Sequence, residues 1–134
     1  MIFILRPMNM DDTGFMLELK NYPETRRFAI QSHKEIRLED HWKWLSRNVK
    51  YFQVIEGREK NRLGAVRIHL NEVSIWVNRA YWGKGIATDV LNKISKPGLL
   101  ARIVDGNIAS FKAFVRAGFE PIQHKKNYYI LRRK

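Results

Sequence analysis

The chain has 134 residues, of which 25 are Lys or Arg and 13 are Asp or Glu, so its formal net charge is +12. This length suits one domain with one core, and the absence of Cys excludes disulfide bonds and thiolate chemistry. The excess of basic residues either favours anionic partners or only keeps the surface soluble, and no nucleic-acid-binding motif accompanies it. We expect a soluble, cytoplasmic protein, because the apolar run at residues 1–5 is too short for a signal sequence or a membrane span.

The first part of the chain predicts one strand followed by two helices. Residues 2–6 are strand-like and end at Pro7. Asp11 or Asp12 is expected to cap a helix that ends near residues 21–23. A second helical region follows, and its predicted core stripe consists of Leu38, Trp42, Leu45 and Val49, at i, i+4, i+7 and i+11.

The remainder alternates between strands and helices. Residues 51–56, 63–70 and 73–77 predict three strands in a meander. A helix beginning near residue 86 ends at Pro97, and a short strand follows at residues 99–104. Asn107 is a good N-cap for a helix that Gly118 ends, and the last two strands are expected at residues 119–123 and 128–132. The order β-αα-βββ-α-β-α-ββ predicts a single α/β (α+β) domain over residues 1–134, with a mixed six- to seven-stranded sheet flanked by about four helices.

A glycine loop joins the third strand of the meander to the helix that follows it, with the sequence YWGKGIAT at residues 81–88. A strand, a short glycine loop and a helix N-terminus present unpaired backbone N–H groups and a partial positive charge, which suit a phosphate or pyrophosphate. A P-loop is excluded because Gly85 follows Lys84, and a dinucleotide-binding turn needs a third glycine where Thr88 stands. The alternative is an ordinary strand-to-helix turn.

Three features together resemble the GNAT superfamily of acetyl-CoA-dependent N-acetyltransferases. The first is the element order, and the second is the loop, which fits the family pattern Q/R-x-x-G-x-G/A except at Trp82. The third is Asn107-Ile108-Ala109-Ser110 followed by Gly118-Phe119, which resembles the N-x-x-S…G-F signature. The loop wording is typical of the branch that contains ribosomal-protein alanine N-acetyltransferases. Two further patterns resemble amino-sugar-nucleotide N-acetyltransferases: Ile36, His41 and Trp44 (I-x4-H-x2-W), and Gly64 with Arg67 (G-x-x-R).

The resemblance implies acetyl-CoA as co-substrate and no metal. The pyrophosphate would lie over the amides from Gly83 to Ala87, where Lys84 either assists as a cation or is only a solvated loop residue. The pantetheine arm would run along the main chain of residues 75–77, and Asn107 would contact it, cap the helix, or do both. The implied coenzyme-binding residues are Ile75, Trp76, Val77, Trp82, Gly83, Lys84, Gly85, Ile86, Ala87, Thr88, Asn107 and Ser110.

Catalysis needs a base for the ammonium form of the amine and optionally an acid for the leaving thiolate. Glu72 begins the strand where several family members keep a base, although it could equally be a surface turn residue. His69, on the same strand face as Arg67, is the alternative base. Many members carry Tyr where this chain has Phe114, so Ser110 or a water would act as the acid, or none is needed. Tyr128 is a further hydroxyl without a spacing argument.

Substrate recognition is expected from the early helices and the meander. His41 and Trp44 lie off the predicted core stripe, so we expect them to face away from the deepest core and to meet a base or sugar ring, or to pack on a loop. With Arg67 and His69 they are the candidate substrate-binding residues.

The expected reaction is acetylation of a primary amine on an anionic small molecule, such as an amino-sugar nucleotide, by direct attack in a ternary complex. One alternative acceptor is a protein α-amino group, as in ribosomal-protein acetylation, although a charge of +12 repels a basic polypeptide. Another alternative is a basic nucleic-acid-binding or regulatory domain that binds CoA without turnover. The sequence leaves open whether the protein is a monomer or a homodimer.

Overall fold

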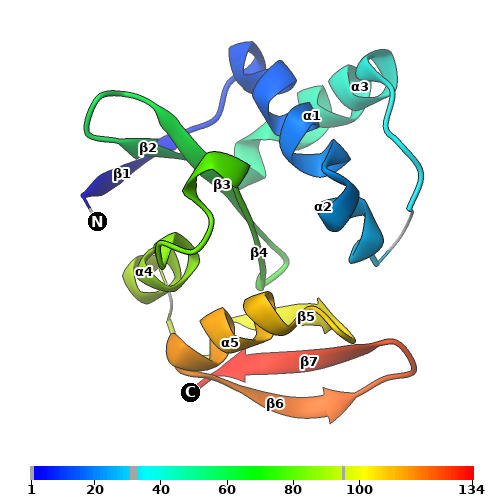
Figure 1. Ribbon diagram of the computed structural model, residues 1–134, viewed down its shortest axis with the longest axis vertical. Coiled ribbons are helices and arrows are strands. Elements are labelled where there is room, and N and C mark those ends of the chain that lie inside the picture. The colour runs from blue at the N-terminus through cyan, green and yellow to red at the C-terminus, as the bar shows by residue number, and fades with distance from the viewer. Residues whose placement is uncertain (1, 31–32, 95) are drawn as a thin grey trace.

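The computed structural model describes residues 2–30, 33–94 and 96–134. Five α-helices and seven strands are present in these ranges, and Figure 1 shows their arrangement. The helices are α1 (Thr13–Asn21), α2 (Pro23–Arg27), α3 (Leu38–Asn48), α4 (Ile86–Ile94) and α5 (Ile108–Arg116), with 3₁₀ turns η1 (Met10–Asp12), η2 (Val49–Tyr51) and η3 (Arg79–Tyr81). The strands are β1 (Phe3–Pro7), β2 (Phe52–Gly57), β3 (Arg62–His69), β4 (Glu72–Val77), β5 (Leu100–Val104), β6 (Phe119–His124) and β7 (Tyr128–Arg133).

The strands form one mixed sheet in the order β1-β2-β3-β4-β5-β7-β6. Every neighbouring pair is antiparallel except β4 and β5, which run parallel. Their pairing is limited to Glu72 opposite Leu100, and the two strands then separate, with β1 to β4 above and β5 to β7 below in Figure 1. The main chain of β4 from Ser74 to Val77 is therefore left unpaired on the side toward β5, whereas its other side pairs with β3.

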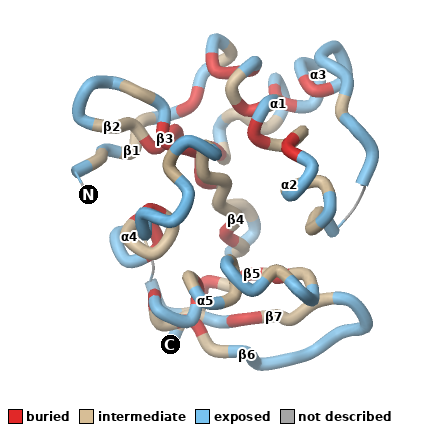
Figure 2. Tube along the Cα trace, in the orientation of Figure 1, coloured by how far each residue is buried: buried red, intermediate tan, exposed pale blue. Residues whose placement is uncertain are grey.

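Helices cover both faces of the sheet because the strands alternate buried side chains between two cores. One core lies under α1 and α3, and the other lies under α4 and α5; buried segments follow both in Figure 2. The first includes Met8, Met16, Leu19, Tyr22, Leu45, Phe52, Val54 and Ala65. The second includes Ile55, Val66, Val73, Ile86, Val90, Leu91, Phe114 and Leu131.

The predicted fold class, the element order and the three-stranded meander are confirmed, and the sheet has seven strands. The short helix α2 was not predicted because its sequence, PETRR, carries no apolar period, although Pro23 is a favoured first helical residue. Asp12, one of the two predicted alternatives, occupies the N-cap position of α1, but its side chain makes no capping hydrogen bond to that helix. Its side chain accepts hydrogen bonds from Arg6 at 2.9 Å, and Asn9 caps the preceding turn instead.

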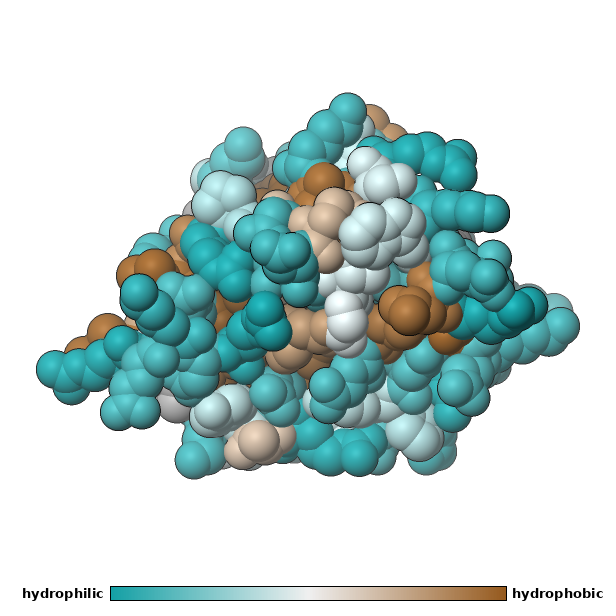
Figure 3. Space-filling model, turned by 90° about the horizontal axis from the view of Figure 1, so that it is seen from above, coloured by the Kyte–Doolittle hydropathy of each residue, from teal (hydrophilic) through white to brown (hydrophobic). Residues whose placement is uncertain are grey.

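The predicted core stripe of α3 is also wrong in part. Leu45 is fully buried, but Leu38 and Trp42 are 59% and 50% exposed, and His41 is 1% exposed. The helix therefore faces the core with His41 and Leu45, so that His41 takes the buried place predicted for its neighbour Trp42. The outward apolar residues line a shallow groove with Met10. Viewed from this end of the molecule, the surface is largely hydrophilic, with apolar side chains gathered between charged ones (Figure 3).

No helix among the described residues is both long and apolar enough to cross a membrane.

Candidate active site

The glycine loop between β4 and α4 has an open surface. Gly83 and Gly85 adopt φ values of 78° and 77°, a left-handed conformation that other residues rarely adopt. A Cβ atom on either residue would meet nothing within 4 Å, so backbone conformation, and not crowding, requires glycine here. The amide of Asp89 donates the first hydrogen bond of α4 to the carbonyl of Gly85 at 3.1 Å. The preceding amides are therefore free of helical partners and can meet an anion.

Side chains of the loop hold it in place. The indole Nε1 of Trp82 donates to the carbonyl of Val77 at 2.8 Å, and its ring lies edge-on to Tyr22 at 6.0 Å. Ile86 is 2% exposed and packs in the core under α4. Lys84 is exposed, whereas Ala87 and Thr88 are half-buried. Of these predicted coenzyme-binding residues, Trp82 and Ile86 thus have structural roles for their side chains, which leaves their main-chain groups and Lys84 for a ligand.

The open edge of β4 lies next to this loop. Ile75 and Val77 pack against the core under α4 and α5, while Trp76 points to the other face and stacks on Phe52 at 5.9 Å. The side chains of Ile75 and Val77 are therefore committed to packing, and Phe52 covers one side of the Trp76 ring. On the side where β5 has separated, the main-chain groups of Ile75 and the amide of Val77 remain available, whereas the carbonyl of Val77 already accepts from Trp82.

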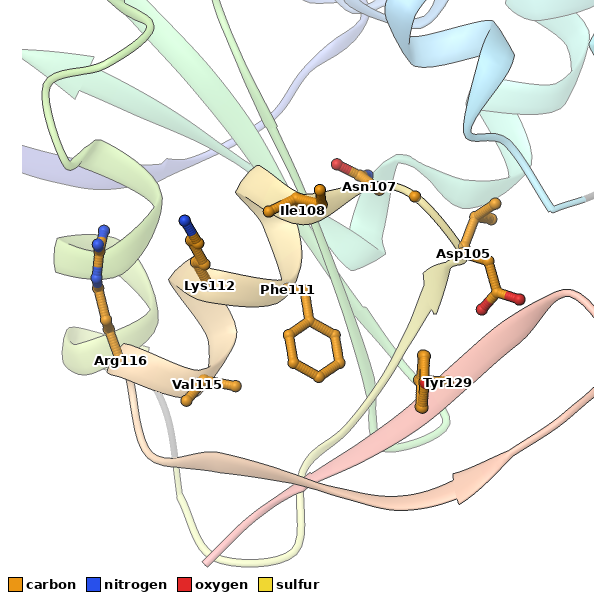
Figure 4. A pocket seen from close by; sticks show the side chains of 10 residues that line it. Asp105, Asn107, Ile108, Phe111, Lys112, Val115, Arg116 and Tyr129 are labelled. Carbon is orange, nitrogen blue, oxygen red and sulfur yellow. The ribbon is translucent and has the colours of Figure 1, made fainter.

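The beginning of α5 borders a hollow of about 580 Å³ (Figure 4). The side chain of Asn107 accepts a hydrogen bond from the amide of Ser110 at 3.4 Å, so the predicted capping role is confirmed. Lys112 and Arg116 extend from the same helix at the rim of the hollow. We did not predict these two cations, although their i, i+4 spacing after the Asn107 cap was a usable signal.

Glu72 lies where β4 and β5 meet, and it accepts a hydrogen bond from Arg102 Nε at 2.8 Å. Arg102 was not predicted to belong to the site. Arg67 and His69 share a strand face as predicted, and Arg67 Nη2 donates to His69 Nδ1 at 2.9 Å. Because Nδ1 accepts this bond, the neutral ring carries its proton on Nε2 and has no free lone pair for a base. His69 also packs on the ring of Tyr51 at 3.9 Å.

A further group of side chains gathers on the opposite face of the sheet from α4 and α5. Lys20 Nζ lies 3.6 Å from the ring centre of Trp44 and 5.9 Å from those of Phe52 and Trp76. Trp44 in turn stacks on His41, with ring centres 6.0 Å apart. We call Lys20, His41, Trp44, Arg67 and Trp76 the basic-aromatic cluster.

The electrostatics of this cluster are unusual. Burial, and then the charge of Arg67, lowers the pKa of Lys20 to about 8. Burial, and then the charge of Lys20, lowers the pKa of His41 to about 4. The expectation that His41 and Trp44 face away from the core is therefore wrong for His41, because α1 and β2 pack along its edge of the helix; Trp44 remains 36% exposed. The sequence analysis missed Lys20, which lies one helical turn after the buried Met16; a solvated lysine would show the same spacing, so its burial left no local signal.

Residues 3–120 match the sequence profile of the family described as "Acetyltransferase (GNAT) domain". The chain belongs to the GNAT acetyltransferase family. It is accordingly an acetyl-CoA-dependent N-acetyltransferase, and the splayed strands beside a glycine loop suit the coenzyme that this family uses. A comparison with curated proteins finds no match.

Several solved structures share this GNAT fold. A spermidine N-acetyltransferase from Vibrio cholerae, in complex with CoA and spermine, is 16% identical, with a TM-score of 0.77; the alignment covers 97% of this chain and 92% of that one. A ribosomal-protein-alanine N-acetyltransferase from Brucella melitensis is 22% identical, with a TM-score of 0.72 and coverage of 97% and 98%. A domain from Methanocaldococcus jannaschii is 20% identical, with a TM-score of 0.79 and coverage of 98% and 97%. At these identities the likeness establishes the fold alone.

The residues of this GNAT chain that were considered for the acid step, or that replace it, differ in burial. Phe114 is 2% exposed and packs edge-on against Phe119 at 4.9 Å, so it is a core residue of α5. Ser110 is half-buried in the first turn of the same helix, and Tyr128 is half-buried at the start of β7. Among the described residues, no three His, Asp or Glu side chains lie together in a way that could hold a metal ion.

Proposed function

We propose that this enzyme acetylates a primary amine on an anionic small molecule, such as an amino-sugar nucleotide, by direct attack within a ternary complex. The observation that supports it most is the unpaired edge of β4, because this strand leads into the open glycine loop and also carries Trp76 of the basic-aromatic cluster. One side of this edge suits a phosphate-bearing thioester, and the other offers aromatic and cationic side chains to an acceptor.

The coenzyme would be held mainly by main-chain groups. The amides from Gly83 to Ala87 would receive its pyrophosphate, and Lys84 supplies an exposed cation beside them. Lys112 and Arg116 offer further positive charge from α5. Residues 75–77 would hydrogen-bond the pantetheine amides, and one of their N–H groups would polarise the thioester carbonyl. Asn107 and Ser110 complete the proposed coenzyme-binding set.

The acceptor must lose a proton before its nitrogen attacks the carbonyl carbon. We assign this step to Glu72, acting directly or through a water, with Arg102 fixing the orientation of the carboxylate. As the C–N bond forms, the C–S bond breaks and the thiolate leaves with the electron pair. Because Phe114 has no hydroxyl, a water or Ser110 supplies the proton that the thiolate takes up.

The charge of the molecule supports an anionic acceptor over a basic polypeptide. A net charge of +12 attracts phosphorylated small molecules and repels the tails of basic proteins. The preference is modest because charges beyond about 8 Å are largely screened at physiological salt. The exposed part of the Trp44 ring, in the same cluster as Trp76, suits contact with a nucleobase or sugar.

The test is release of the CoA thiol from acetyl-CoA in the presence of an amine panel. The panel contains amino-sugar nucleotides, free amino sugars, polyamines and peptides with N-terminal alanine. We expect the highest kcat/KM with an amino-sugar nucleotide, and a rate at least about tenfold lower for Glu72→Gln at neutral pH. A preference for the peptides would mean that the acceptor is a protein α-amino group and not a small molecule. Binding of acetyl-CoA without turnover of any amine would favour the alternative of a domain that binds CoA without catalysis.

A further inference from the structure

The basic-aromatic cluster brings together positive side chains without a counter-ion. The two cations are Lys20 from α1 and Arg67 from β3, and the uncharged ring of His41 from α3 lies with them on one face of the sheet. Among the described residues, neither Lys20 nor Arg67 forms an ion pair with Asp or Glu. Like charges removed from water without a partner destabilise the folded chain. Packing alone therefore does not explain why these two charged side chains lie together.

The buried carboxylate of Asp12 is fully neutralised, in contrast to the charge of Lys20. Asp12 is 1% exposed and meets two guanidinium groups, Arg6 at 2.9 Å and Arg62 at 3.1 Å. Within residues 2–30, 33–94 and 96–134, no carboxylate pairs with the Lys20 ammonium, whose surroundings include the rings of Trp44, Phe52 and Trp76. An anion from outside the chain would supply what the sequence does not.

Two buried nitrogen atoms of the cluster also have no hydrogen-bond partner in the part of the chain that the structure describes. These are Nε2 of His41, whose side chain is 1% exposed, and Nε of Arg67. A buried donor without an acceptor is costly, and native structures seldom keep one. Because the pKa of His41 is lowered to about 4, its ring is neutral at pH 7 and can donate one hydrogen bond from a protonated Nε2.

The position of the cluster relates it to the acceptor and not to the coenzyme phosphates. Arg67 lies opposite Ser74 in the β3–β4 pairing, and Trp76 is two residues further along β4. These residues face the α1 and α3 side of the strand whose unpaired edge would hold the thioester arm. Trp44 is 36% exposed, so the cluster borders solvent on the α3 side.

We propose that Lys20, Arg67 and His41 bind an oxyanion of the acceptor, a carboxylate or a phosphate, while the rings of Trp44 and Trp76 flank the atoms that join it to the amine. This inference rests on the proposed acetyl transfer for the identity of the ligand as an acceptor. The same lining disfavours polyamines, because an additional ammonium group would approach Lys20 and Arg67 with like charge.

Binding of the anion alone is tested without acetyl transfer. Inorganic phosphate and acetate are titrated separately at constant ionic strength while the ring C–H signals of His41, assigned with His41→Gln, are followed by NMR. We expect saturable shifts with at least one anion, and the arm with the tighter binding identifies phosphate or carboxylate. Lys20→Met should weaken that binding about tenfold or more, and Lys20→Arg should restore most of it. The control is Lys43→Met, which removes the same charge from an exposed position of α3 and should bind as the native protein does.

The proposal is overturned if neither anion shifts the His41 signals, or if the shifts survive unchanged in Lys20→Met.

A series of matched amines then separates this inference from the proposed function. The series is O-phosphoethanolamine, β-alanine, ethanolamine and putrescine, each with acetyl-CoA. We expect a higher kcat/KM for the anionic amines than for ethanolamine, putrescine last, and a loss in Lys20→Met that is about tenfold greater for the anionic amines. Turnover of ethanolamine with the same response to Lys20→Met for every amine would remove the anion subsite and leave acetyl transfer standing. Lys20-dependent anion binding without turnover of any amine would keep the anion subsite and contradict the proposed acetyl transfer.

Discussion

Lys20 is a residue whose charge opposes folding, because it is largely buried beside Arg67 and against the rings of Trp44, Phe52 and Trp76. Its pKa of about 8 lies below the ordinary 10.5, so the unfolded chain holds the proton more tightly than the folded one. Below pH 8 both states are protonated and the full cost is present. The cost declines as the pH rises from 8 to 10.5 and is absent above that value.

We therefore predict that Lys20→Met raises the free energy of unfolding at pH 7 by about 2 kcal/mol, after allowing for the lost attraction to Trp44. The gain should shrink toward pH 10.5. Urea unfolding at pH 7 and at pH 10 measures both values. Lys43→Met, with the same side-chain change at an exposed site, should show neither effect. If Lys20→Met is no more stable than the native protein at pH 7, the charge at this position is not destabilising.

At the scale of elements, the glycine loop combines a backbone requirement with an open surface. Gly85 has φ 77°, and Gly98, after α4, has φ 92°; in both cases an added Cβ meets nothing within 4 Å. We predict that Gly85→Ala and Gly98→Ala each lower the free energy of unfolding by about 1 kcal/mol, because alanine rarely adopts this conformation. Only Gly85→Ala should also raise the KM for acetyl-CoA, since its methyl group projects where the pyrophosphate would approach.

Thermal unfolding and steady-state kinetics separate these two effects. Equal increases in KM for both variants would mean that strain alone, and not proximity to the ligand, causes the change.

The sequence predicted the elements well because their signals are local. Alternation of apolar residues, the Asn107 cap and the glycines around Lys84 act within a few residues of one another. The orientation of α3 was not predictable in this way, because it carries apolar residues on two sides. Trp42 and Leu45 are both apolar enough for a core, and only the packing of α1 and β2 selects the edge with His41.

The same limit applies to the candidate site. The glycine loop was recognised because its motif spans contiguous residues, whereas the separation of β4 from β5 was not predicted from the sequence. Lys20 and Arg102 were not predicted, because each acquires its importance from a partner distant in the sequence, Arg67 for the first and Glu72 for the second. A lysine on an amphipathic helix gives no signal of its burial until the opposing strands are in place.

At the scale of the molecule, Asp12 joins segments that the sequence keeps far apart. Its carboxylate accepts hydrogen bonds from Arg6 of β1, which also bonds Glu56 of β2 at 2.7 Å, and it lies 3.1 Å from Arg62 of β3. Burial raises the pKa of Asp12, but the hydrogen bonds from Arg6 and from the Asn9 amide, with the charges of both arginines, outweigh burial and lower the pKa below 3.8. The network thus ties the first strand and the first helix to the centre of the sheet.

The sign of this shift fixes how the network responds to acid. A carboxyl group with a lowered pKa stabilises the fold above its ordinary pKa, and the contribution is lost as the pH falls below 3.8 through the lowered value. We predict that Asp12→Asn lowers the free energy of unfolding by about 2–3 kcal/mol at pH 7, because it leaves two guanidinium groups without their shared anion. Asp11→Asn, at the exposed neighbouring position, should change it little. Denaturant unfolding at pH 7 and at pH 3 provides the check: the difference between Asp12→Asn and the native protein should narrow at pH 3, and a difference that stays constant would mean that the charge of Asp12 contributes nothing.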